Sequence, residues 1–294
     1  MKKISFAVAV LLLTFSCRNT DTAAEEKKVD SPLHYDLTGT GDVTLVFIHG
    51  WCINGSYWDN QVAAFKDRYQ VLTLDLAGHG QSKMPKPEYT IEEHGRDVAD
   101  LITQLGLKKI ILIGHSMSGD VALHVYNILR NRVMGFIGID NLQQLGVIPT
   151  DEENEQYAAF FLAMRKDFAN LVTEFAKANL FSETTSDSIK ARVIRDFVSA
   201  DVDFAVSTIV SLQFEGENER TLAPKLMVPM YLILSDNGRD PLYEEASLKQ
   251  YCGAGYKVWT IKGTGHYPMI EDVPEFNRVL AEVLDTIRNN FSGQ

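Results

Sequence analysis

The feature that most constrains this chain is an apolar run that passes into a helical pattern with almost no connecting loop. Residues 110–113 are β-forming, and Ser116 follows them within three positions, with small residues at Gly114, Ser118 and Gly119. A sharp strand-to-helix turn strains the backbone, so only small neighbours fit around it. Such a turn would hold the Ser116 hydroxyl at a helix N-terminus, where the dipole favours negative charge. The alternative is a serine that only caps the helix.

Strand and helix patterns alternate on both sides of this turn. Apolar, strand-like runs alternate with segments of helical spacing; the strands are expected at about 43–50, 69–75, 109–114, 133–140, 230–235 and 256–261. Helices are expected between them at about 56–68, 90–105 and 117–130, and later from about 241 and over 274–289. Strands separated by helices of this length form right-handed crossovers, so the pattern predicts an α/β fold with a mainly parallel sheet.

The alternation stops between residues 141 and 225. Helical candidates there span about 151–165, 167–180, 186–199 and 201–214, with an aromatic-rich apolar stripe. Aromatic residues at helical spacing usually pack in a core. A helical insertion over the carboxyl edge of a parallel sheet is nevertheless well placed to roof a pocket.

Two further segments end at the same edge of the predicted sheet as Ser116. His266 lies in a glycine-rich loop between the last strand and the last helix, and His49 and Gly50 follow the strand at 43–48. At this edge the free backbone N–H of Trp51 could pair with the N–H of Met117 to bind an oxyanion. Together these residues favour a nucleophilic serine over a simple helix cap.

The motifs in this order resemble those of the α/β-hydrolase fold family over roughly residues 32–290: HGW, DLAGHGQS, GHSMSG and GTGHYPMIEDVPEF. The resemblance implies an eight-stranded, mainly parallel sheet with helices on both faces and an inserted all-helical cap. It assigns residues 32–140 and 226–294 to the core and 141–225 to the cap. It also implies Ser116 as nucleophile, His266 as base, and Trp51 and Met117 as the oxyanion hole.

Other family positions carry weaker information. The segment Asp75 to Ser82 matches a family loop that is usually structural, and we interpret it so. The elbow has Ser118 where the family usually has glycine, a departure that a small side chain tolerates.

The acid of the implied triad is ambiguous. The family places it after the strand at 230–235, where it would accept a hydrogen bond from His266. Asp236 falls two residues before the expected position and Asp240 two residues after it, so the sequence supports either one. Asp140, at the end of the strand at 133–140, is a third candidate on the same edge.

The resemblance predicts a serine hydrolase that cleaves a carboxylic ester or a related acyl compound, with a small-molecule acyl substrate. Serine at the elbow argues against the related dehalogenases and epoxide hydrolases, which use aspartate there. The alternatives are a haloperoxidase-like or perhydrolase activity without a cofactor, which uses the same triad, and a non-catalytic ligand-binding protein that keeps the fold. The sequence shows no metal-binding constellation, and the implied mechanism needs neither a metal nor a cofactor.

The N-terminus predicts export. Two lysines precede a 12-residue, mostly apolar segment, which is short for a membrane span and suitable for a signal peptide over residues 1–16. Ser16 and Cys17 resemble the lipobox of bacterial lipoproteins, although Thr14 stands where leucine is usual. Residues 17–31 would then form a polar tether from a lipidated Cys17. A plain secreted or periplasmic protein is the alternative.

The net charge indicates which partners are not expected, and the cysteine positions indicate whether a disulfide forms. The formal net charge is −11 and no basic cluster is present, so a nucleic-acid partner is not expected. A membrane would be contacted only through the lipid anchor. Cys52 and Cys252 are far apart in the sequence, and we expect both to be free.

Overall fold

The computed structural model describes residues 29–83, 86–236 and 242–292. These residues form one seven-stranded sheet with the strand order β1-β3-β2-β4-β5-β6-β7, parallel except for β1, which pairs antiparallel with β3. The strands are β1 Tyr35–Thr38, β2 Thr44–Ile48, β3 Gln70–Leu74, β4 Ile110–His115, β5 Val133–Ile139, β6 Met230–Ser235 and β7 Tyr256–Ile261. The prediction of a mainly parallel α/β sheet is confirmed.

The strand count differs from the expected eight. Within the described part of the chain, a single strand, β1, precedes the first parallel strand. Its four residues lie at the sheet edge and are at least partly exposed. The central strands β2, β4 and β6 are buried throughout, which explains their continuous apolar runs.

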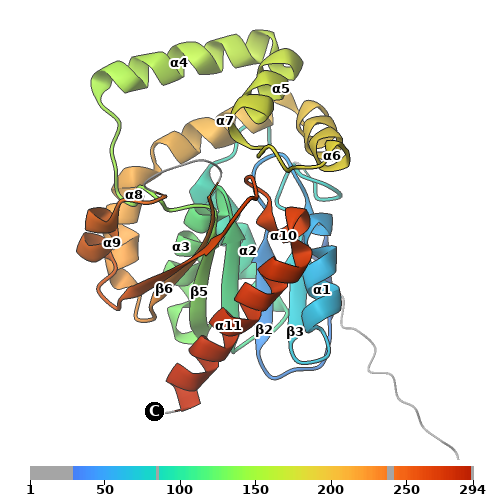
Figure 1. Cartoon of the computed structure of the whole chain (residues 1–294), viewed down its shortest axis with the longest axis vertical. Coiled ribbons are helices and arrows are strands. Elements are labelled where there is room, and N and C mark those ends of the chain that lie inside the picture. The colour runs from blue at the N-terminus through green and yellow to red at the C-terminus, as the bar shows by residue number, and fades with distance from the viewer. Residues whose placement is uncertain (1–28, 84–85, 237–241, 293–294) are drawn as a thin grey trace, which may run out of the picture.

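Helices cover both faces of the sheet (Figure 1). The helix α11 packs against β5, β6 and β7 and also contacts α1, whereas α3 packs against β4 and β5 beside α2. The core helices are α1 Asp59–Phe65, α2 Ile91–Gln104, α3 Ser118–Leu129, α9 Glu245–Tyr251, α10 Pro268–Glu271 and α11 Val273–Ser292, with short 3-10 turns at η1 Gly55–Trp58 and η2 Arg130–Arg132. A capping box begins α2, because Thr90 and Glu93 each accept the other's backbone N–H through their side chains.

Helices also make up the segment between β5 and β6. They are α4 Asp151–Lys166, α5 Phe168–Asn179, α6 Asp187–Val198, α7 Val202–Gln213, α8 Glu215–Leu222 and the 3-10 turn η3 Ala223–Lys225. The first four match the expected helices, and α8 and η3 are additional. Figure 1 shows α4 to α7 stacked over one end of the sheet, at the top of the view. The helical insertion is therefore present.

The N-terminal predictions concern residues that the structure does not describe. The signal peptide over residues 1–16, Cys17 and the tether as far as residue 28 all fall outside the described ranges. Among the described residues no helix combines the length and the apolar character that a membrane crossing requires. Cys52 and Cys252 are both free and buried, as expected.

Candidate active site

Ser116 occupies the turn between β4 and α3 with a φ of 54°, in the left-handed region that non-glycine residues rarely adopt. The crowding around it explains the small residues of the motif. A Cβ on Gly114 would lie 2.0 Å from the Ser118 carbonyl oxygen, so no larger residue fits at position 114. The turn therefore presents the Ser116 hydroxyl at the start of α3, as predicted.

Asn141 holds this turn from the neighbouring strand end, a role that the sequence did not reveal. Its Nδ2 donates hydrogen bonds to the carbonyl oxygens of Gly114 at 2.8 Å and Ser116 at 3.0 Å. The Ser116 N–H donates to the Ile139 carbonyl at 3.0 Å. The position of Asn141 directly after a predicted strand was the only signal of this role in the sequence. These bonds offset the strain of the left-handed serine.

His266 lies in the loop between β7 and α10 and contacts Ser116, as the sequence suggested. Its Nε2 is 2.8 Å from Ser116 Oγ, and its Nδ1 is 2.5 Å from Asp140 Oδ2. Its backbone N–H donates to the Leu180 carbonyl at 2.8 Å, which links the loop to the segment after α5. The His266 side chain is 12% exposed and that of Asp140 only 1% exposed. The imidazole is thus held between a hydroxyl and a buried carboxylate.

The sequence favoured Asp236 or Asp240 as the carboxylate that contacts His266, whereas in the structure Asp140 makes this contact. Asp236 accepts the Gly263 N–H at 2.9 Å and holds the histidine loop by its backbone, while Asp240 lies outside the described residues. Asp140, the third candidate, is placed by its own turn after β5, where its φ is 47°. Its second oxygen, Oδ1, accepts hydrogen bonds from the Ser235 N–H and the Gln143 amide, both at 3.2 Å.

The residues expected to form an oxyanion hole also lie at this edge. In the described part of the chain, neither the Trp51 N–H nor the Met117 N–H has a hydrogen-bond acceptor. Gly50 lets the two segments approach, because a Cβ there would lie 2.8 Å from His115 Nδ1 and 3.0 Å from Ser116 Cβ. Both amides are therefore available to a ligand beside Ser116.

A mostly apolar cavity of about 310 Å³ opens onto Ser116 and His266. One side comes from the sheet edge and the other from the inserted helices, through Phe175 and Asn179 of α5, Leu180, Phe197 of α6, and Ile209 and Leu212 of α7. Among the described residues that line it there is no lysine or arginine. The cavity suits an uncharged, largely apolar group of modest size.

His115 is one of the residues that line this cavity, and it connects the turn at Ser116 to the loop that carries His266. Burial lowers the pKa of His115 to about 3, so its imidazole is neutral at ordinary pH. Its Nε2–H donates to the His266 carbonyl oxygen at 2.7 Å. The bond restrains the backbone of the residue whose side chain faces Ser116.

The model of the alpha/beta hydrolase fold family matches residues 43–191 of this chain, about half of its length. The chain belongs to the α/β-hydrolase family. It is 31% identical over 106 residues to the pimeloyl-[acyl-carrier protein] methyl ester esterase of Wigglesworthia glossinidia brevipalpis, a match that covers 36% of this chain and 39% of the relative. It is 32% identical over 106 residues to a putative non-heme chloroperoxidase of Synechocystis sp., covering 35% and 38%.

The chain spans about two fifths or less of the length of the curated relatives that it matches. The fold likeness extends further. A thermophilic esterase from Thermogutta terrifontis superposes with a TM-score of 0.74 at 22% identity, and the alignment covers 87% of this chain and 93% of that structure. This likeness shows the shared fold of the α/β hydrolase.

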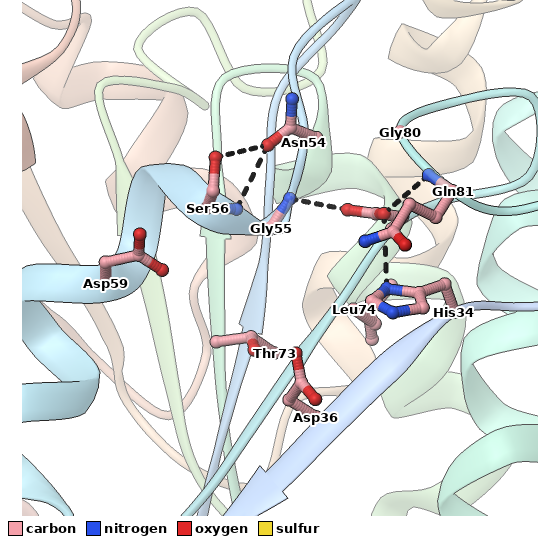
Figure 2. A pocket seen from close by; sticks show the side chains of 11 residues that line it. His34, Asp36, Asn54, Gly55, Ser56, Asp59, Thr73, Leu74, Gly80 and Gln81 are labelled. Carbon is pink, nitrogen blue, oxygen red and sulfur yellow. Dashed lines mark hydrogen bonds and ion pairs between the residues drawn. The ribbon is translucent and has the colours of Figure 1, made fainter.

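A second hollow in this α/β hydrolase, of about 260 Å³, lies beside β1 and β3 (Figure 2). Asp75 is among its lining residues, and its carboxylate oxygens accept the N–H groups of Gly55 at 2.7 Å and Gln81 at 2.8 Å. Ser82 donates to the Asp75 carbonyl at 2.6 Å. These contacts join two loops by their backbones, which agrees with the structural interpretation of the segment from Asp75 to Ser82.

Within residues 29–83, 86–236 and 242–292, no group of three or more His, Cys, Asp or Glu side chains could hold a metal ion.

Proposed function

We propose that this α/β hydrolase is a serine hydrolase that cleaves a carboxylic ester or a related acyl compound through an acyl-enzyme. The observation that carries the proposal is the His266 imidazole, which bonds Ser116 Oγ through one nitrogen and Asp140 through the other. This order of hydroxyl, imidazole and buried carboxylate is the arrangement that activates a serine for acyl transfer.

In the acylation step, Ser116 Oγ forms a bond to the substrate carbonyl carbon while His266 Nε2 takes the hydroxyl proton. The carbonyl electron pair moves to oxygen, and the N–H groups of Trp51 and Met117 bind the resulting oxyanion. Collapse of this intermediate expels the alcohol, which receives the proton from His266. Asp140 keeps Nδ1 protonated and stabilises the imidazolium.

In the deacylation step, water attacks the acyl carbon and His266 takes one of its protons. Collapse of the second tetrahedral intermediate breaks the bond to Ser116 Oγ, which regains a proton from His266. The products are a carboxylic acid and the restored serine. The chain's own residues thus carry every proton transfer of the cycle.

The cavity supports an uncharged, mainly apolar acyl group as the substrate part that lies beside Ser116. Its volume of about 310 Å³ corresponds to about ten groups the size of a water molecule or methylene. The similarity to a methyl ester esterase supports the same reaction class.

Perhydrolysis is a second candidate, favoured by the relative named a non-heme chloroperoxidase. Hydrogen peroxide in place of water would attack the same acyl-enzyme, giving a peracid and free Ser116. Hydrolysis and perhydrolysis are separated by assaying one ester with and without peroxide.

A fluorophosphonate probe and a panel of p-nitrophenyl esters of increasing acyl length test the proposal. We expect the probe to label the wild type at Ser116, and Ser116→Ala to lose both labelling and roughly 10⁴-fold or more of the turnover. A wild type that is neither labelled nor active on any ester would indicate a non-catalytic ligand-binding protein. Equal turnover by both proteins would remove Ser116 from the mechanism.

A further inference from the structure

The loop that follows β2 is attached to the inserted helices as well as to the core. We call residues 49–58 the oxyanion loop, because it contains Trp51, whose N–H is a proposed oxyanion donor. Tyr57 lies at its far end and is fully buried. Its hydroxyl donates a hydrogen bond of 2.8 Å to Asp196 Oδ2 of α6, a residue 139 positions away in the sequence.

Arg192, one turn before Asp196 on α6, strengthens this attachment. Its guanidinium carbon lies 3.9 Å from the centre of the Tyr57 ring, a cation–π contact. Its Nη2 donates to Ser56 Oγ at 2.8 Å. Burial raises the pKa of Tyr57, so the hydroxyl remains a donor. Side chains of the helix α6 therefore contact both Ser56 and Tyr57.

The other end of the oxyanion loop meets the same group of helices through the Trp51 side chain. The indole N–H donates a buried hydrogen bond of 2.9 Å to the Ala205 carbonyl of α7. The Trp51 ring also contacts Phe197 of α6 edge-on, with 5.1 Å between ring centres, and Phe168 of α5 at 6.3 Å. The residue with the proposed oxyanion donor is thus held by side-chain contacts to α5, α6 and α7.

We infer that α6 sets the position of the oxyanion loop through the Tyr57–Asp196 hydrogen bond, and that Tyr57 is a positioning residue for the proposed ester hydrolysis. The inference rests on the proposed function, since it concerns the same site. Tyr57 stands between two parts of that site. Its ring centre lies 5.9 Å from that of Tyr267, which in turn lies 5.4 Å from the His266 ring.

If Tyr57 positions the oxyanion loop, its loss changes kcat and KM in a way that a purely stabilising residue would not. An oxyanion donor interacts with charge that develops in the transition state, so its displacement lowers kcat more than it alters KM. Tyr57 is not among the residues that line the cavity. Loss of its hydroxyl should therefore leave substrate binding nearly unchanged.

Tyr57→Phe tests the inference, with Tyr126→Phe as the matched control. Tyr126 is also a buried tyrosine, and its hydroxyl accepts the Met227 N–H at 2.8 Å, away from the oxyanion loop. We expect Tyr57→Phe to lower kcat by about ten-fold, a part of the 100-fold or more that loss of a whole oxyanion donor costs. KM should stay within about two-fold of the wild type. The control should keep the wild-type kcat.

Two further measurements make the result specific. Affinity for a boronic acid, which forms a tetrahedral adduct with an activated serine, should fall in Tyr57→Phe by the same factor as kcat. Hydrogen exchange of peptides covering residues 49–58 should be faster in Tyr57→Phe than in the control, whatever the chemistry of the site. If Tyr57→Phe does not fold, Asp196→Ala removes the same bond from α6, where the Asp196 side chain is 18% exposed.

The outcomes separate the inference from the proposed function. Unchanged kcat and unchanged exchange in a labelled, active protein would overturn the inference and leave the proposed function intact. An equal fall of kcat in the control would also overturn it, because the effect would then be general destabilisation. A wild type without labelling or turnover would remove the proposed function and the kinetic role of Tyr57 with it.

Discussion

At the scale of single residues, backbone strain gathers around the candidate site. The described residues with a positive φ other than glycine are Cys52, Ser116, Asp140 and Leu142, and all four follow strands β2, β4 or β5 at the same edge. Such conformations cost free energy and persist only where neighbouring bonds enforce them. Asn141 provides these bonds for the serine, and the Ile233 carbonyl accepts the Asp140 N–H at 2.9 Å. The strain places the hydroxyl and the carboxylate on opposite sides of His266.

The identity of the acid gives a prediction at this scale. Asp140→Asn should lower kcat for ester hydrolysis by roughly 10⁴-fold, because the amide no longer holds His266 in the productive tautomer. Asp236→Asn, the matched control, should stay within a few-fold, since Asp236 bonds the Gly263 backbone and not the imidazole. Steady-state kinetics on one p-nitrophenyl ester decides between them. Full activity of Asp140→Asn would return the acid to Asp236 or Asp240.

At the scale of elements, the inserted helices form part of the cavity wall as well as the cover of the candidate site. The helix α7 supplies Ile209 and Leu212 to the cavity wall and the Ala205 carbonyl to the Trp51 indole. The helix α6 supplies Phe197 to the same wall. Most of the residues on the helical side of the cavity are apolar, so we expect their size to set the acyl preference of the proposed ester hydrolysis.

Leu212→Ala is the variant that checks this assignment. Removing three side-chain carbons enlarges the cavity, and we expect the acyl length with the highest kcat/KM to increase by about two carbons. The ester panel measures this shift. Leu162→Ala serves as the control, because Leu162 lies on α4 with 63% of its surface exposed. An unchanged length preference in Leu212→Ala would place the acyl group elsewhere.

At the scale of the whole molecule, buried histidines make stability depend on pH. Burial lowers the pKa of His49, His79, His94 and His115 below the ordinary value of 6.5. These four imidazoles therefore bind more protons in the unfolded chain than in the folded chain below pH 6.5, and their contribution to the free energy of unfolding falls as the pH falls. Burial raises the pKa of Asp120 and of Glu219, so the contribution of these two carboxyls to the free energy of unfolding falls as the pH rises above their ordinary values of 3.8 and 4.5.

His94→Phe isolates one part of this acid sensitivity. Both ring nitrogens of His94 lack hydrogen-bond partners among the described residues, and the ring packs against Tyr89 and Phe204. Below pH 6.5 the variant should lose up to about 1.4 kcal/mol less of its free energy of unfolding per pH unit than the wild type. Urea unfolding between pH 7 and 5 measures this slope. Parallel slopes would show that His94 protonates in the folded state as easily as in the unfolded one.

Local patterns in the sequence determined the order of strands and helices, the strained turn at Ser116 and the loop that holds His266. These features depend on neighbouring residues: apolar runs specify buried strands, and small residues permit the sharp turn. The placement of Cys17 on a lipid anchor and the export of the protein stay predictions of the same kind, from residues outside the described ranges.

Only the tertiary structure decided which carboxylate meets His266, how Asn141 holds the turn, and how α6 reaches Tyr57. Asp140 and Asp236 both follow buried strands of the same sheet, so their sequence contexts are nearly equivalent. The two carboxylates differ in their orientation, because the turn after β5 places the Asp140 carboxylate against the imidazole of His266, 126 positions away in the sequence. Local preferences act over a few residues, whereas a hydrogen bond between distant segments depends on how the whole sheet and its helices pack.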